Sequence, residues 1–214
     1  MMTPIILTEN GIKMNKFDLS IVLNASIIIL EILALIICLE SMGSIDLTYY
    51  TVDSNIFLLV SSILYLIFRK NTPKIVELLK YSSTLSVMIT FLVVIFVLLP
   101  MYDFNYQFFL LDGPNLYVHV ICPILALVSF VFFERNNLEN TLRNNLRAVY
   151  FTIVYAVIIL ILNIQKIVTG PYPFLKVYEQ SLIMSVFWIV LIMGATFVLA
   201  WTLLAVKDLD RILY

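Results

Sequence analysis

The sequence predicts an all-α membrane protein, a single domain over residues 1–214 built as a bundle of six transmembrane helices. Hydrophobic residues make up 62% of the chain and charged residues only 13%, and the mean hydropathy is +1.03. Soluble domains are nearer half apolar and a quarter charged. The apolar residues gather in runs long enough to cross a bilayer. The six predicted spans are about 21–38, 48–68, 81–99, 116–133, 148–163 and 181–206.

The first three spans differ in their polar residues. Span one, about 21–38, carries the charged residue Glu31 near its middle. Span two, about 48–68, opens with Thr51-Val52-Asp53-Ser54-Asn55 and then continues as an apolar run. Span three, about 81–99, follows a basic connector. Inside lipid these segments must be helical, because an isolated strand cannot satisfy its own backbone groups there.

The last three spans complete the bundle. Span four, about 116–133, contains His119, the only histidine of the chain. Span five is about 148–163, and span six, about 181–206, is long enough to tilt or to emerge at one end. The runs are continuous rather than alternating, which argues against a β-barrel. Short connectors predict antiparallel neighbours.

The distribution of basic residues predicts that both termini are cytoplasmic. Eleven of the 13 Lys and Arg residues fall in the N-terminal tail, the second and fourth connectors and the C-terminus. Only Lys166 and Lys176 fall on the other side. Cytoplasmic loops carry such an excess. The stretch 1–16 lacks a basic start, an apolar core and a cleavage site, so no cleaved signal peptide is expected.

Composition also excludes several classes of function. The net charge is −1 and no basic patch is present, which excludes nucleic acid as a partner. Cys38 and Cys122 both fall in apolar runs, so a secreted disulfide framework is excluded. One histidine and two separated cysteines give no zinc-site spacing. Five glycines and no glycine-rich loop argue against a nucleotide site. We expect no metal and no organic cofactor.

His119 is the first candidate for a functional residue. Ionisable groups inside a membrane are costly and usually face a protein interior or a wet cavity. Thr51 and His119 each lie three residues inside the outer end of their span. At about 1.5 Å per residue, both lie roughly 4–5 Å below that end. The two side chains are therefore predicted to lie at the same depth.

Thr51 belongs to a polar stripe on span two. Thr51 and Asn55 are four residues apart and share a helix face, Ser54 borders it, and Ser62 returns close to the same direction. Asp53 points about 200° away. We expect the stripe to face the interior of the bundle.

Threonine opposite histidine predicts nucleophilic chemistry. A threonine hydroxyl becomes a nucleophile when a base removes its proton, and histidine has the appropriate pKa. Pro123 lacks an N–H, so the carbonyl of His119 is expected to lose its helical donor and to recruit water or a hydroxyl. The alternatives are a histidine buried for packing and a threonine bonded to its own helix backbone.

Four further residues are candidates for supporting roles, each with an alternative. Asn55 fits an oxyanion donor or a bond between helices. Asp53 fits a partner for His119, a partner for a tyrosine, or a solvated interfacial acid. Cys122, one turn beyond His119, is a rival nucleophile, although buried thiols are usually inert. Glu31 fits a proton or ion carrier, which keeps a transport function open.

Two predicted outer connectors, 100–115 and 170–178, are aromatic and carry little charge. Such segments suit the membrane interface, where Tyr and Trp concentrate. They fit an anchoring belt or a roof over the entrance for a lipid-like substrate.

Three short motifs in order along the chain resemble a known family. They are Thr51-x-x-Ser54-Asn55, His119-Val-Ile-Cys-Pro123 and Tyr172-Pro-Phe174. Over roughly residues 18–205 the chain resembles the androgen-induced membrane proteins and their small bacterial multipass relatives. The resemblance implies hydrolysis of fatty acid esters of hydroxy fatty acids, with Thr51 as nucleophile and His119 as its partner. The third motif adds Tyr172 to the candidates for a supporting role at the site.

These observations together predict an intramembrane hydrolase of long-chain fatty acid esters in a bacterial plasma membrane. Its partners would be a lipid-like ester and membrane lipids, and no oligomeric state is indicated. The alternatives are a carrier or binding protein for a small solute or lipid, and an acyltransferase that uses the same Thr51–His119 pair.

Overall fold

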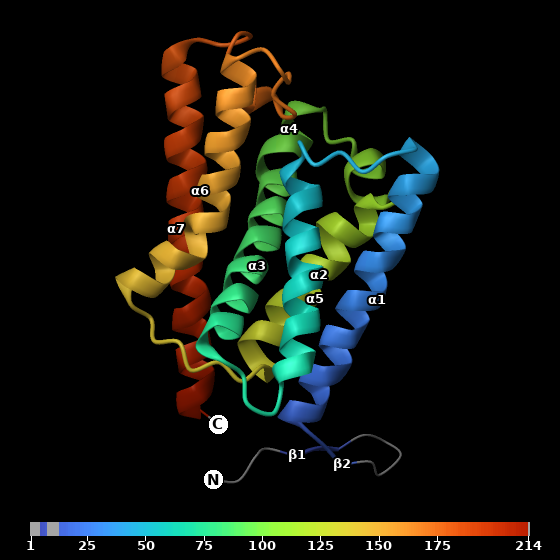
Figure 1. Ribbon diagram of the computed structural model, residues 1–214, viewed down its shortest axis with the longest axis vertical. Coiled ribbons are helices and arrows are strands. Elements are labelled where there is room, and N and C mark those ends of the chain that lie inside the picture. The colour runs from blue at the N-terminus through green and yellow to red at the C-terminus, as the bar shows by residue number, and fades with distance from the viewer. Residues whose placement is uncertain (1–4, 8–12, 214) are drawn as a thin grey trace.

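The computed structural model describes residues 5–7 and 13–213, and most of them are helical. Long helices run side by side along the longest axis of the molecule (Figure 1). Before the first helix, β1 (Ile5–Leu7) and β2 (Lys13–Asn15) pair as a short antiparallel ribbon. The long helices are α1 (Lys16–Met42), α2 (Tyr50–Phe68), α3 (Lys74–Val93), α6 (Leu142–Ile164) and α7 (Leu182–Leu213).

The all-helical membrane architecture is confirmed, but the count of six long spans is not. In the part of the chain that the structure describes, five helices are long and apolar enough to cross a membrane. The fourth predicted span is the shorter apolar helix Tyr117–Phe133. At about 1.5 Å per residue its 17 residues reach roughly 25 Å, against a hydrocarbon core of about 30 Å.

This shorter helix is also irregular. It consists of the π-helical η3 (Leu116–Ile121), α5 (Cys122–Val128) and the π-helical η4 (Ser129–Phe133). It runs obliquely behind α2 (Figure 1). A second irregular stretch extends α3 through η1 (Val94–Leu98) and α4 (Leu99–Met101), and η2 (Gln107–Leu111) lies in the connector that follows. π-Helical turns occur frequently at functional sites.

Helix α3 lies at the centre of the bundle and packs against α2, α5, α6 and α7. Small hydroxyl side chains join it to its neighbours. Ser83 bonds Ser61 of α2 at 2.6 Å, and Ser82 donates to the carbonyl of Ala148 on α6 at 2.6 Å. Small polar residues let helices approach closely and form bonds between them in a membrane. The outer surfaces are apolar, as with Leu182 and Ile183, which are 80% and 81% exposed.

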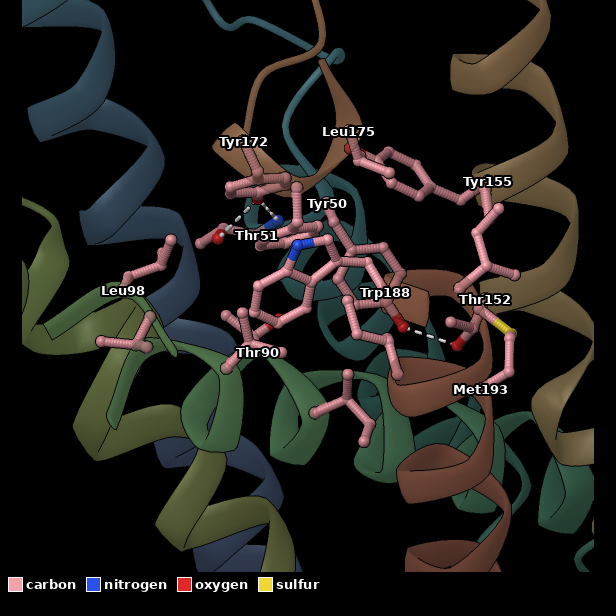
Figure 2. Close-up of a pocket in the computed structure, with 17 residues that line it drawn as sticks. Tyr50, Thr51, Thr90, Leu98, Thr152, Tyr155, Tyr172, Leu175, Trp188 and Met193 are labelled. Carbon is pink, nitrogen blue, oxygen red and sulfur yellow. Dashed lines mark hydrogen bonds between the residues drawn. The ribbon is translucent and has the colours of Figure 1, made fainter. Parts of the chain in front are cut away.

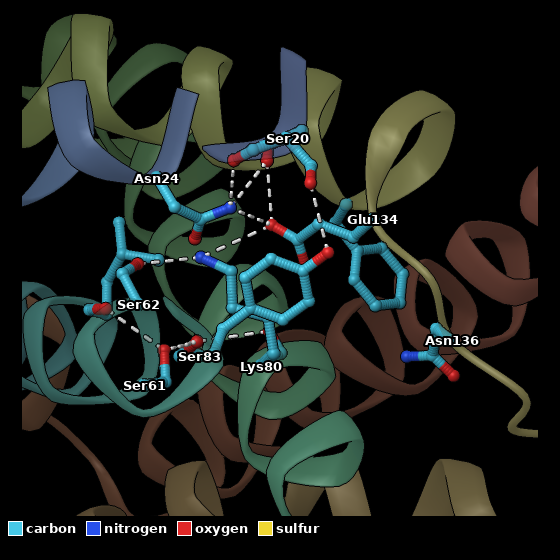
Figure 3. Close-up of polar contacts among 12 residues, drawn as sticks. Ser20, Asn24, Ser61, Ser62, Lys80, Ser83, Glu134 and Asn136 are labelled. Carbon is cyan, nitrogen blue, oxygen red and sulfur yellow. Dashed lines mark hydrogen bonds and ion pairs between the residues drawn. The ribbon is translucent and has the colours of Figure 1, made fainter. Parts of the chain in front are cut away.

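A buried charged cluster lies between α1, α2, α3 and the end of η4 (Figure 3). Lys80 Nζ donates to Ser62 Oγ at 2.7 Å and lies 3.6 Å from Glu134 Oε1. The same carboxylate oxygen accepts from Asn24 Nδ2 at 2.9 Å and from Ser129 Oγ at 2.7 Å. Lys80 and Glu134 therefore join four helical segments in the interior.

Candidate active site

Thr51 and His119 are brought together as their matched depths predict. Thr51 lies in the first turn of α2, and His119 lies in η3, 68 residues later. Thr51 Oγ1 is 3.4 Å from His119 Nε2. His119 is only 7% exposed. The hydroxyl of half-buried Thr51 and the imidazole of buried His119 thus lie within hydrogen-bonding reach.

The carbonyl of Phe109 in η2 determines which nitrogen of His119 faces Thr51. His119 Nδ1 lies 2.7 Å from Phe109 O. A carbonyl oxygen can only accept, so Nδ1 carries the hydrogen in the neutral ring. The lone pair of Nε2 is then directed at the threonine hydroxyl, which is the arrangement of a base. Sequence reasoning missed Phe109, because a backbone acceptor leaves no signal in the identity of its side chain.

Tyr172 is the third member of the site (Figure 2). Its hydroxyl oxygen lies 3.3 Å from Thr51 Oγ1 and accepts from the N–H of Thr51 at 3.2 Å. That N–H is in the first turn of α2, where backbone donors have no partner within the helix. Burial raises the pKa of Tyr172 to about 12, while its hydrogen bonds with Thr51 act in the opposite direction. The phenol is therefore protonated and able to donate at neutral pH.

Asn55 joins helices, and its role as an oxyanion donor is not supported. Its Nδ2 donates to the carbonyl of Thr51 at 2.7 Å and to the carbonyl of Val118 at 3.3 Å. The N–H of Cys122 donates to Tyr117, five residues earlier, so in this register Pro123 stands opposite the carbonyl of Val118. That the carbonyl of His119 also lacks a helical donor stays a prediction. Asn55 supplies a donor to the carbonyl of Val118, which Pro123 cannot do.

Ser54 supports Thr51 without reaching His119. Its Oγ lies 3.1 Å from the carbonyl of Thr51 and 3.0 Å from Thr90 Oγ1 on α3. Ser54 is fully buried. It fixes the first turn of α2 against α3 and so holds the backbone of Thr51 in place.

Asp53 lies away from the Thr51–His119 pair, and the prediction that it orients the histidine is wrong. Its side chain lines a second cavity, between α2 and α6, together with Thr48, Phe151 and Tyr155. This placement follows from its position on the opposite side of α2. The orienting role belongs to the carbonyl of Phe109.

Cys122 packs behind the site. It is fully buried in a cluster with Ile27, Leu58, Val87 and Ala126. Its thiol is within hydrogen-bonding reach of the Glu31 carboxyl on α1. The other carboxyl oxygen of Glu31 is buried and has no hydrogen-bond partner among the described residues. Cys122 is thus placed to contact Glu31 and apolar side chains.

A cavity of about 70 Å³ opens beside Thr51. Thr51 and Tyr172 form one wall, and the remaining walls come from α3, α6 and α7, with the apolar side chains of Ile89, Trp188 and Ile192 among them (Figure 2). His119 approaches Thr51 Oγ1 from outside this set of lining residues. An apolar chain in the cavity would thus meet the threonine hydroxyl first, with the histidine behind it.

A metal centre is not indicated by the described residues. Over residues 5–7 and 13–213, no three His, Cys, Asp or Glu side chains are grouped closely enough to hold a metal ion. The polar groups that the site brings together are a hydroxyl, an imidazole and a phenol.

Comparison of the chain with known protein families, with curated proteins and with solved structures finds no match. The functional assignment below consequently depends on the geometry of the site and on the three short motifs.

Proposed function

We propose that this protein is an intramembrane hydrolase of long-chain fatty acid esters, with Thr51 as nucleophile and His119 as base. One observation carries the proposal. Thr51 Oγ1 lies 3.4 Å from a histidine nitrogen whose lone pair is free, on the wall of an apolar cavity. The resemblance of the Thr51, His119 and Tyr172 segments to the androgen-induced membrane proteins supports the same assignment.

The reaction follows a two-step acyl transfer. His119 Nε2 takes the proton of Thr51, and Thr51 Oγ1 attacks the carbonyl carbon of the ester. The tetrahedral intermediate collapses, and the alcohol leaves with the proton held by His119. A water molecule then gives its proton to His119 and attacks the acyl-threonine, which releases the fatty acid and restores the hydroxyl.

The cavity receives the acyl chain and positions the ester. Each methylene group removed from water contributes about 0.8 kcal/mol. A lipid already dissolved in the membrane gains less than this, so the cavity acts mainly by holding the ester carbonyl against Thr51. Aromatic side chains from the connector after α6, among them Tyr172 and Phe174, cover its outer end.

We infer that the chain crosses a bacterial plasma membrane six times, with Tyr117–Phe133 as the shortest crossing. The excess of Lys and Arg on one side supports cytoplasmic termini. A short helix is accommodated by local thinning of the bilayer. In this orientation Thr51 lies beneath the outer face, where an ester could enter sideways from the lipid.

Labelling with a fluorophosphonate ester tests the proposal. We expect the purified protein to be labelled, and Thr51→Ala and His119→Ala to lose the label while they remain folded. Thr196→Ala is the matched control, because Thr196 is a buried threonine that only bonds the carbonyl of Ile192 on its own helix. Label that persists in Thr51→Ala would show that another residue is the nucleophile.

A carrier is the second candidate, and Glu31 is the observation that favours it. Its carboxyl is 1% exposed and one oxygen has no partner within the described chain. Such a group inside a membrane is typical of a proton or ion pathway. Folded wild-type protein that takes no label would favour this function. An acyltransferase would take the label, and transfer of the acyl group to an added alcohol would identify it.

A further inference from the structure

The proposed reaction places negative charge on the carbonyl oxygen of the ester, and a donor must stabilise it there. Asn55 is not available, because both hydrogens of its amide are used by the carbonyls of Thr51 and Val118. Ser54 donates to the carbonyl of Thr51 or pairs with Thr90. The side chains that flank Thr51 on its own helix are therefore engaged elsewhere.

Most of the other hydroxyl groups on the cavity wall are also engaged. Tyr155 donates to the carbonyl of Thr48 at 2.6 Å. Thr90 donates to the carbonyl of Ser86 at 3.3 Å. Tyr50 and Thr152 bond one another at 2.7 Å, on the part of the wall away from Tyr172 (Figure 2).

Tyr172 differs from these hydroxyls because its oxygen lies 3.3 Å from the oxygen of the proposed nucleophile itself. When Thr51 donates to His119, the oxygen of Thr51 becomes the acceptor of the Tyr172 hydroxyl at 3.3 Å. Attack on the ester draws electron density from that oxygen into the new C–O bond, so it becomes a weaker acceptor than the developing oxyanion. The developing oxyanion is bonded to the same carbon as Thr51 Oγ1, so it forms next to the phenol hydrogen.

The backbone of α2 increases the strength of this donor. The phenol oxygen accepts the N–H of Thr51 at 3.2 Å, which polarises the O–H bond. Thr51 lies in the first turn of α2, where the helix dipole favours negative charge. Both effects are built into the fold before substrate arrives.

We propose that the Tyr172 hydroxyl is the oxyanion donor of this site. It gives a hydrogen bond and keeps its proton, while the electron pair of the carbonyl double bond moves to the oxygen that it faces. The inference rests on the proposed ester hydrolysis and adds a third catalytic residue to it.

The position of the phenol is fixed by its connector. The ring of Tyr172 stacks on Phe174, with centroids 5.2 Å apart and planes within 5°. It also makes a perpendicular contact with the ring of Tyr49, with centroids 5.9 Å apart. Tyr172 is 9% exposed, so the hydroxyl is shielded from water that would compete for the oxyanion.

The test compares wild type with Tyr172→Phe, which keeps the ring and removes only the hydroxyl. Hydrolysis of p-nitrophenyl octanoate gives kcat and KM. Two inhibitors with the same chain, a trifluoromethyl ketone and a methyl ketone, give affinities for a charged tetrahedral adduct and for a neutral carbonyl. Tyr178→Phe is the control, because its hydroxyl bonds the carbonyl of Ile164 at 2.7 Å on the same connector.

We expect Tyr172→Phe to lower kcat by about 10²–10³-fold with little change in KM. The affinity for the trifluoromethyl ketone should fall by a similar factor, while the affinity for the methyl ketone stays the same. Tyr178→Phe should match wild type. A merely structural role of Tyr172 would weaken both ketones equally, and that result would overturn the inference.

Two other results would also overturn it. Trp188 carries an N–H on the same cavity wall, and a loss of kcat in Trp188→Phe but not in Tyr172→Phe would assign the donor to Trp188. Wild-type protein that neither hydrolyses the ester nor takes the fluorophosphonate label would reject the proposed function, and the inference with it. If wild type hydrolyses the ester and Tyr172→Phe is equally active, the inference about Tyr172 is rejected and the proposed function stands.

Discussion

The Nδ1–H of His119 donates to the carbonyl oxygen of Phe109 at 2.7 Å, and this bond directs Nε2 toward Thr51. Many hydrolases use a carboxylate for this purpose. Here a backbone carbonyl provides the orientation without placing a second charge inside the membrane. It fixes the neutral tautomer but stabilises the imidazolium less than a carboxylate would.

Asp53→Asn should therefore leave hydrolysis within about twofold of wild type. The Asp53 side chain lines a different cavity, and His119 Nδ1 is already bonded to Phe109. Loss of an orienting carboxylate in a triad lowers kcat by about 10⁴-fold, so the two cases are easily separated. The measurement is kcat on p-nitrophenyl octanoate, with His119→Ala as the inactive reference. A large loss in Asp53→Asn would mean that Asp53 reaches His119 after all.

Gly170→Ala should lower kcat by displacing Tyr172. A Cβ atom at Gly170 would lie 2.5 Å from the backbone carbon and oxygen of Leu175, so the connector must shift to admit it. Tyr172 lies between these two residues and would move with them. Gly194→Ala is the control, because a Cβ there meets no atom within 4 Å.

The expected loss for Gly170→Ala is of the same order as that of Tyr172→Phe, about 10²-fold or more. It should be accompanied by weaker labelling of Thr51 and by a lower melting temperature in detergent. Wild-type kcat in Gly170→Ala would show that the connector does not need its present conformation for activity.

The sequence predicted the parts of the site that depend on helix register. Thr51 and His119 each lie three residues inside a span, and a fixed rise per residue brings them to one level. The same geometry correctly turned Asp53 away from Thr51. These relations needed only the span boundaries and the directions of the helices.

The parts that could not be predicted depend on backbone irregularity. The π-helical η3 places the carbonyl of Val118 opposite Pro123, where regular α-helical spacing would place that of His119. No residue type specifies such a turn, because it results from packing against neighbouring helices. The bond from His119 to Phe109 was hidden for the same reason: its acceptor belongs to the backbone of another irregular helix.

Ala156→Phe should shift the chain-length preference of the proposed hydrolase. Ala156 lines the cavity beside Thr51, and a phenyl group there would occupy much of its volume of about 70 Å³. We expect hydrolysis of p-nitrophenyl palmitate to fall by at least tenfold while hydrolysis of p-nitrophenyl acetate changes little. Ala195→Phe, on an exposed position of α7, is the control. Equal losses on both esters would indicate damage to the site and not a filled cavity.

Lys80→Met should destabilise the protein by about 3–5 kcal/mol, because it leaves the Glu134 carboxylate buried without its cation. Both side chains are 1% exposed. The double variant Lys80→Met/Glu134→Gln should recover much of that loss, since it removes both charges and keeps an amide that Asn24 and Ser129 can bond. Thermal unfolding in detergent measures the stability of wild type, Lys80→Met and the double variant.

The matched control is the surface pair Lys176–Glu179, whose charged atoms are 3.0 Å apart and whose side chains are 32% and 60% exposed. There Lys176→Met should lower the free energy of unfolding by less than about 1 kcal/mol. A double variant that is less stable than Lys80→Met would show that the pair contributes more than the cost of burying its charges.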